Sequence, residues 1–187
     1  MTGCEALVIG GSAGSLEVLM KVLPAIDLQI TFPIIIIIHR KQGTDSLLSD
    51  LLATRTKLRV KEVEEKEPIL AGTIYVAPAD YHLLVEKDHS FSLDYSEKIN
   101  YSRPAIDVTF QSAAEIYQSK LSCILLSGSN ADGVNGLIAV NYYLGETVAQ
   151  EPTSAQVDYM PAQAILRAKI DHVLHPDEMA DYINSLT

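Results

Sequence analysis

The run "PIIIII" (Pro33–Ile38) constrains the fold more than any other feature of this sequence. It is entirely apolar and mostly β-branched, and it lacks the apolar–polar alternation of a strand with one face in water. Such a run predicts a strand that is covered on both faces. "ALVI" (Ala6–Ile9) and "LSCILLSG" (Leu121–Gly128) indicate two more strands of this kind. Several such strands are typical of a parallel sheet with helices on both sides.

Amphipathic segments separate the apolar runs along the whole chain. We expect helices at 15–23, 45–53, 105–119, 134–143, 160–167 and 177–186. Further strands are predicted at 58–63, near a sheet edge, at 146–150 and at 172–174. The stretch 72–95 has short strand-like runs between turn residues, which indicates a hairpin-rich insertion. We therefore expect an α/β fold: a three-layer αβα sandwich with a mostly parallel, doubly wound sheet and a β-hairpin insertion, forming a single domain over residues 1–187.

Composition and charge exclude several classes of protein. Lys and Arg number 14 against 24 Asp and Glu, and this formal charge of −10 argues against a nucleic-acid partner, because phosphate recognition depends on clustered cations. Cys4 and Cys123 lie in apolar runs and are expected to be small core residues rather than a disulfide framework. No signal peptide is visible, and no apolar run approaches the roughly 20 residues that span a bilayer. We expect a cytoplasmic protein without direct membrane insertion.

Three reactive side chains follow the three most apolar strands. In a parallel sheet the loops at the carboxyl ends of the strands meet at one edge, and ligands collect there. Ser12 follows the first strand in "GGSAG", His39 follows the second in "HRK", and Asp132 follows the third in "SGSNADG". A serine, a histidine and an aspartate are the nucleophile, the base and the orienting carboxylate of a hydrolytic triad. We therefore expect these side chains to form a catalytic site.

Each of the three residues also has a purely structural interpretation. Ser12 could be a helix N-cap, His39 a polar residue that ends a strand, and Asp132 the cap of a turn or helix. Their joint placement at one edge favours the triad. The other histidines lack such a placement and are expected to be surface or structural residues: His82, His89, His172 and His175.

The glycine-rich loop around Ser12 fits no nucleotide-binding motif. Counting from Gly10, the dinucleotide pattern G-x-G-x-x-G meets serines where it needs glycines, and "HRK" stands where an acidic ribose ligand is expected. A P-loop needs Gly-Lys-Ser or Gly-Lys-Thr, and the sequence contains neither. The pattern G-x-S-x-G is present at Gly10, Ser12 and Gly14, although the order serine, histidine, aspartate differs from that of α/β-hydrolases.

Six stretches spread over the chain carry a family resemblance. They are "VIGGSAGSLEVL", "IIIHR", "EKEPILAGTIYVAPADYHLLV", "SRPAIDVTFQSAAE", "LLSGSNADGVNGL" and "AQEPTSAQVDYMPAQAI". They resemble, in the same order, the blocks "IGASTGG", "QHM", "GEPL" through "YIAP" to "HL", "RPSVDVLFRSAA", "LTGMGxDGAxGL" and one that ends in "MPxAAI". These blocks belong to the catalytic domain of the chemotaxis protein-glutamate methylesterases, the CheB family, and the resemblance covers nearly the whole chain.

The resemblance implies a reaction and a role for each residue of the triad. By the motifs, Ser12 is the nucleophile, His39 the general base and Asp132 its orienting acid. The family removes methyl groups from glutamyl methyl esters on chemoreceptor signalling helices, some members also deamidate glutamine, and it needs no metal or organic cofactor. For the oxyanion we expect backbone donors at Ala13 and Ser129. The implied partners are methylated chemoreceptor helices, with a receiver domain or a methyltransferase of the same pathway as further candidates.

The sequence departs from the family blocks beside the expected site. Ala13 replaces a threonine and Ser15 a glycine, while Ser129 and Asn130 replace a methionine and a glycine. "RK" (40–41) replaces Met-Pro, and the receiver domain that family members usually carry is not expected within residues 1–187. Two alternatives stay open: a serine esterase or amidase with another substrate, and a non-catalytic signalling module that binds a helix or an anion in the same cleft.

Overall fold

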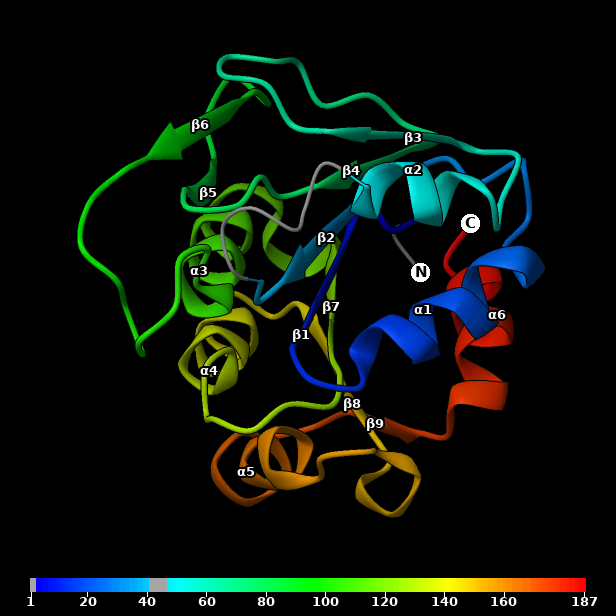
Figure 1. The fold of residues 1–187 in the computed structure, drawn as a ribbon, viewed down its shortest axis with the longest axis vertical. Helices are drawn as coiled ribbons and strands as arrows, with labels where there is room; N and C mark the ends of the chain where they lie inside the picture. Colours follow the sequence, from blue (N-terminus) through cyan, green and yellow to red (C-terminus); the bar gives the residue numbers. More distant parts are fainter. Residues whose placement is uncertain (1–2, 41–46) are drawn as a thin grey trace.

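The computed structural model describes residues 3–40 and 47–187 and contains a seven-stranded, fully parallel sheet (Figure 1). Its strands, in order across the sheet, are β3 (Arg59–Glu62), β4 (Thr73–Val76), β2 (Ile34–Ile38), β1 (Ala6–Gly11), β7 (Leu121–Leu125), β8 (Glu146–Gln150) and β9 (His172–Leu174). An antiparallel hairpin of β5 (His82–Val85) and β6 (Phe91–Asp94) lies outside this sheet.

Helices cover both faces of the sheet. Their bounds are α1 (Ser15–Val22), α2 (Leu48–Ala53), α3 (Ile106–Tyr117), α4 (Val134–Tyr142), α5 (Tyr159–Arg167) and α6 (Pro176–Ser185). Figure 1 shows α3 and α4 on one side of the sheet and α1 and α6 on the other. Within residues 3–40 and 47–187, every helix is too short or too polar to cross a bilayer.

The side chains of each central strand point alternately into two cores. In β2, Ile35 and Ile37 pack in the core that includes α3, α4 and α5. Ile34, Ile36 and Ile38 pack in the core that includes α1, α2 and α6. All five side chains are buried. This burial on both faces is the physical reason why the strand is apolar without alternation.

The order of the strands creates a crevice beside β1. The chain moves from β1 to β2 on one side and later returns to place β7 on the other side. After β1 the chain enters α1, which packs on one face, and after β7 it enters α4, which packs on the opposite face. The two connections therefore diverge at the carboxyl ends of these strands, where doubly wound sheets bind their ligands.

The predicted fold class is confirmed: a three-layer α/β sandwich with a parallel sheet and a small hairpin. β3 lies at a sheet edge, as expected. One expectation is wrong, because Thr73–Val76 belongs to the main sheet, between β3 and β2, and not to a hairpin-rich insertion. Its four residues are all buried, but the run is short and turn residues flank it. The helix expected at 45–53 is α2, and residues 45–46 lie outside the described residues.

Candidate active site

Strand pairing places Ser12 and His39 next to each other. Gly11 ends β1 and pairs with Ile38, which ends β2. The amide of His39 then donates to the carbonyl of Gly11 at 3.1 Å. The chain turns sharply into α1 through Gly14, whose φ of 84° lies in the left-handed region that glycine adopts without strain. Ser12 and His39 are therefore the first residues beyond two adjacent parallel strands.

The loop after β7 lies against the other side of Ser12. The amide of Ser12 donates to the carbonyl of Ser127 at 2.9 Å, and a Cβ added to Gly128 would lie 3.0 Å from the Cβ of Ser12. Glycine permits this close approach, since a side chain here would crowd Ser12. The two expected oxyanion donors follow in these loops, Ala13 after Ser12 and Ser129 after Gly128. Among the described residues neither of their amides has a hydrogen-bond acceptor.

His39 contacts Asp132 directly. Nε2 of the imidazole lies 2.7 Å from Oδ2 of the carboxylate. Because an ionised carboxylate can only accept hydrogen bonds, the proton of this contact belongs to Nε2. In the neutral ring Nδ1 then carries the lone pair and is the nitrogen that can accept a proton. The side chain of Asp132 is fully buried and that of His39 is 11% exposed, so solvent reaches only the imidazole end of the pair.

Asp132 accepts hydrogen bonds from several groups besides the imidazole. The donors are the amides of Ile106 (2.7 Å), Asp107 (3.1 Å) and Gly133 (3.1 Å) and Nδ2 of Asn100 (3.0 Å). Burial acts to raise the pKa of Asp132, but the imidazole and these donors outweigh burial and hold the pKa below its ordinary value. Asp132 is therefore ionised and fixed in position at neutral pH.

Asp132 and Asp107 cap each other's helices. Ile106 and Asp107 open α3, so Asp132 accepts from the first two amides of that helix. Asp107 in turn accepts from the amides of Gly133 (2.9 Å) and Gly136 (2.7 Å) at the start of α4. Carboxylates at helix N-termini accept hydrogen bonds from the free amides there and interact favourably with the positive end of the helix dipole. Burial raises the pKa of Asp107, and the negative charge of Asp132 raises it further.

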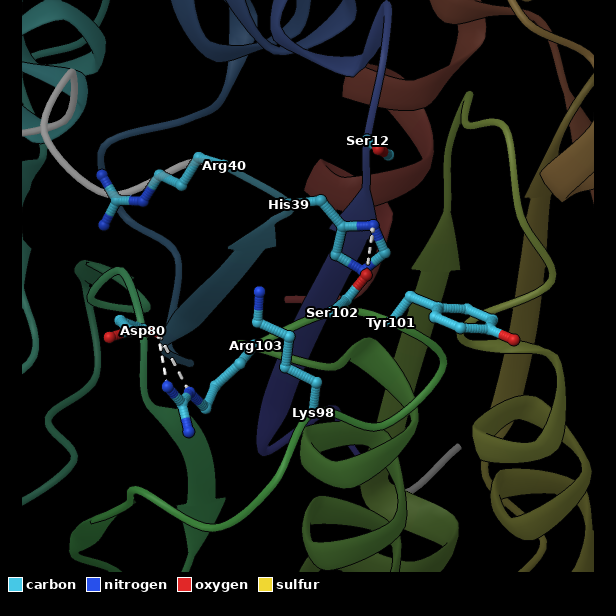
Figure 2. A pocket seen from close by; sticks show the side chains of 8 residues that line it. All are labelled: Ser12, His39, Arg40, Asp80, Lys98, Tyr101, Ser102 and Arg103. Carbon is cyan, nitrogen blue, oxygen red and sulfur yellow. Dashed lines mark hydrogen bonds and ion pairs between the residues drawn. The ribbon is translucent and has the colours of Figure 1, made fainter.

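A surface turn contacts both Asp132 and His39. Nδ2 of Asn100 donates to Asp107 (2.9 Å) as well as to Asp132. Oγ of Ser102 lies 3.3 Å from Nδ1 of His39 (Figure 2). No hydrogen bond joins Ser12 to His39, although both residues are described. In this structure Ser102, rather than Ser12, contacts the nitrogen that would act as the base.

Ser12 and His39 line a cleft of about 600 Å³. Its other lining residues are Arg40, Asp80, Lys98, Tyr101, Ser102 and Arg103 (Figure 2). The lining contains three cations and one carboxylate, in contrast to the charge of −10 on the whole chain. Arg103 pairs with Asp80 at 2.7 Å and Arg40 with Glu62 at 2.9 Å. Lys98 forms no ion pair with any described residue, so its ammonium group is available to a ligand.

A second, smaller hollow adjoins the same two residues. It has a volume of about 340 Å³ and is also bordered by Ala13 and Arg40. Its remaining lining residues are apolar: Leu16, Ile38, Leu47, Leu48 and Leu51. Ser12 and His39 therefore lie between a cationic cleft and an apolar hollow.

The structure brings His39 and Asp132 into contact and places Ser12 in the same cleft, while the catalytic roles of all three stay predictions. Lys41 lies outside the described residues. The buried His82 has a structural position, because its two ring nitrogens contact the carbonyl of Glu97 (2.9 Å) and the amide of Ala105 (3.1 Å).

Three polar residues of the site were not expected from the sequence: Asn100, Ser102 and Asp107. Ser102 and Asp107 lie in the stretch "SRPAIDVTFQSAAE", so the family resemblance marked their segment without giving them a role. Asn100 lies outside that stretch and carried no signal. Its position depends on the sharp turn that precedes α3, which no periodicity predicts.

Comparisons with known proteins agree on one family. The model of the CheB methylesterase family matches residues 7–183. A relative from Leptospira interrogans is 41% identical over 177 residues, which are 95% of this chain and 92% of that protein. A protein-glutamate methylesterase/protein-glutamine glutaminase from Thermotoga maritima is 36% identical over 173 residues, and the match covers 91% of this chain and 50% of that protein. The crystal structure of the Thermotoga maritima CheB methylesterase catalytic domain matches with a TM-score of 0.95 at 33% identity and covers 100% of both chains.

Proposed function

Because this chain belongs to the CheB methylesterase family, we propose that it hydrolyses glutamyl methyl esters and deamidates glutaminyl residues on a partner protein, with Ser12 as the nucleophile. The observation that carries the proposal is the contact of His39 Nε2 with Asp132 at 2.7 Å. In the neutral imidazole this contact places the lone pair on Nδ1, in the cleft that Ser12 also lines. A base and a hydroxyl nucleophile at one cleft are what acyl transfer needs.

The first half of the proposed reaction forms an acyl-enzyme. Nδ1 of His39 takes the hydroxyl proton of Ser12 while Oγ attacks the ester carbonyl. The bond from the carbonyl carbon to the methoxy oxygen then breaks, and the imidazolium gives its proton to the departing methanol. Asp132 stays ionised throughout and keeps the second ring nitrogen protonated.

The second half regenerates the enzyme. A water molecule gives one proton to Nδ1 of His39 and attacks the acyl carbon. The bond to Ser12 breaks, the proton returns to its Oγ, and the glutamate side chain is released. With a glutaminyl substrate the same steps release ammonia instead of methanol. In both halves the amides of Ala13 and Ser129 are the proposed donors to the oxyanion.

The partner that we propose is a methylated cytoplasmic helix of a chemoreceptor, and the protein would act in the cytoplasm. The cations of the cleft support this choice, since unmethylated glutamates beside the ester are anionic. They offset the acidic character of the chain at the place where the substrate docks. A receiver domain and a methyltransferase of the same pathway stay predicted partners.

Methanol release from a methylated chemoreceptor fragment tests the proposed reaction. Ser12→Ala should lower the rate at least about 1000-fold, because the nucleophile is lost. Ser185→Ala, at the exposed end of α6, is the matched control and should keep the wild-type rate. A fluorophosphonate probe should label the wild type and the control but not Ser12→Ala. Full methanol release by Ser12→Ala contradicts the proposal, and a wild type that neither releases methanol nor reacts with the probe favours a binding module.

A further inference from the structure

A strained turn in the wall of the cleft carries an exposed tyrosine. Ile99 and Ser102 pair through two backbone hydrogen bonds of 3.2 and 2.9 Å, with Asn100 and Tyr101 between them. The φ angles of these two central residues are 51° and 62°. Two-residue turns with positive φ at both central positions favour Asn followed by Gly. Asn100 suits its position, whereas Tyr101 stands where glycine is preferred and is strained.

No contact within the described protein offsets this strain. Tyr101 is 97% exposed and forms neither a hydrogen bond nor a ring contact with any described residue. Tyr95, in the same segment, is different, since the guanidinium of Arg103 lies 4.0 Å from its ring centre and Tyr81 lies 5.5 Å away. The ring of Tyr101 therefore contributes nothing to the fold that a glycine would not.

The turn is nevertheless fixed relative to the base. Asn100 donates to Asp107 and Asp132, and Ser102 contacts Nδ1 of His39. The residue between them is thus held at a defined place beside the imidazole. Figure 2 shows Tyr101 on one side of His39 and Arg40 on the opposite side. The ring therefore lies at the edge of the cleft, beside the imidazole.

The same segment also supplies an unpaired charge. Lys98 is exposed, lines the cleft and has no ion-pair partner among the described residues. The segment 98–101 therefore presents an ammonium group and an aromatic ring together, in a cleft whose lining is cationic although the chain is acidic. Such a pair is complementary to a surface with both carboxylates and apolar side chains.

We propose that Tyr101 is a specificity-determining residue that packs on the apolar face of an acidic, amphipathic helix of the partner, while Lys98 pairs with a carboxylate of that helix. This inference rests on the proposed esterase function and names the residues that would bind the substrate helix. The enzyme recognises the helix that carries the ester, and a small ester alone lacks this contact. The strain in the turn is retained because it holds the ring at the docking surface.

Two substrates separate helix recognition from ester chemistry. One is a synthetic amphipathic helical peptide with a single glutamyl γ-methyl ester among glutamates, and the other is N-acetylglutamate γ-methyl ester. Tyr101→Gly and Tyr101→Asn remove the ring and suit a positive φ, whereas Tyr101→Phe keeps the ring. In the first two variants, kcat/KM for the peptide relative to the small ester should fall at least about fivefold, mainly through KM. In Tyr101→Phe the ratio should stay within about twofold.

Leu144→Gly is the matched control for the removal of strain. Leu144 has a φ of 64° and is 79% exposed, but it lies just before β8, at the opposite end of the strands from the cleft. Both Tyr101→Gly and Leu144→Gly should raise Tm by about 2 °C, because glycine relieves the strain. Only the change at position 101 should alter the ratio of the two substrates.

The outcomes distinguish this inference from the proposed function. An unchanged ratio in Tyr101→Gly overturns the inference while leaving the esterase intact. A wild type that cleaves neither ester overturns the proposed function, and binding then decides the inference. In that case the Kd of the fluorescein-labelled, unesterified peptide is measured by anisotropy. A fivefold weaker Kd in Tyr101→Gly supports the role of the ring, whereas an equal Kd, or no binding by the wild type, refutes it.

Discussion

Replacement of Asp107 with alanine tests whether two carboxylates join α3 to α4. In the folded protein Asp107 is 4% exposed and accepts from the amides of Gly133 and Gly136 at the start of α4. The amide of Gly133 also donates to Asp132 at 3.1 Å, so it keeps an acceptor in the variant. The amide of Gly136 loses its carboxylate acceptor, and α4 loses one of the two carboxylates at its N-terminus.

These losses set the magnitude of the effect. A buried amide without an acceptor costs about 1–3 kcal/mol, and a carboxylate at a helix N-terminus contributes about 0.3–1 kcal/mol. Relief of the repulsion between Asp107 and Asp132 offsets part of this sum. We expect the free energy of unfolding at pH 7 to fall by about 2.5 kcal/mol and Tm by about 5–10 °C. Urea unfolding followed by far-ultraviolet circular dichroism measures the first quantity.

Asp107→Asn separates hydrogen bonding from charge. Its amide oxygen can still accept from Gly133 and Gly136, so the loss in unfolding free energy at pH 7 should stay below about 1 kcal/mol. Because the folded pKa of Asp107 is raised, the wild type loses stability as the pH rises from the unfolded pKa through the folded one. The asparagine variant lacks this pH dependence, so its stability relative to the wild type should increase as the pH rises from the unfolded pKa of 3.8 through the raised folded pKa of Asp107.

Two results would refute this reasoning. One is an Asp107→Ala variant whose unfolding free energy lies within about 0.5 kcal/mol of the wild type, because the carboxylate would then not be the cap of α4. The other is a loss in Asp107→Asn equal to that in Asp107→Ala, which would assign the stability to the charge alone.

Two further changes probe the surroundings of Ser12, the proposed nucleophile. Ser102→Ala removes a hydroxyl that would compete with Ser12 for Nδ1 of His39. Because such a hydrogen bond contributes about 1 kcal/mol, kcat/KM for a methyl ester should rise up to about fivefold. A decrease in kcat/KM would mean that Ser102 orients the ring instead. Gly128→Ala would place a Cβ 3.0 Å from the Cβ of Ser12 and 2.5 Å from Cε of Met160, so kcat should fall at least about tenfold. If adding Met160→Ala restores the wild-type kcat, the contact with Ser12 is not the cause.

The central strands could be predicted because strands that are buried on both faces consist almost entirely of apolar residues. Pro33–Ile38 is apolar at every position since α-helices cover both faces of β2, and no alternation can arise. The sequence does not assign Thr73–Val76 to the main sheet because this strand has only four residues and lies between turns. A run of that length fits a hairpin as well as a central strand, and only its pairing with β2 and β3 decides between the two.

The meeting of loops at one edge of the sheet could also be predicted, but the contacts among them could not. The rule for parallel sheets places Ser12, His39 and Asp132 at the same edge, and the structure adds the direct contact between the last two. The exchange of caps between α3 and α4 depends on how the two helices pack. The contact of Ser102 with the imidazole depends on the backbone of one turn. Neither leaves a periodic signal in the sequence.

The position of Asp132 depends on how the helices pack, whereas the positions of the exposed Ala13 and Ser129 side chains do not. Asp132 is fully buried and is held by amides of α3 and α4, so any shift of this carboxylate also removes a helix cap. Ala13 and Ser129, where the sequence departs from the family blocks, are exposed, and their backbone amides do not depend on the side chain. Under the proposed function, substitutions there would change the surface offered to the partner without moving the imidazole. Selection for a different partner can therefore act on the rim and on Tyr101, while helix packing preserves the pair of His39 and Asp132.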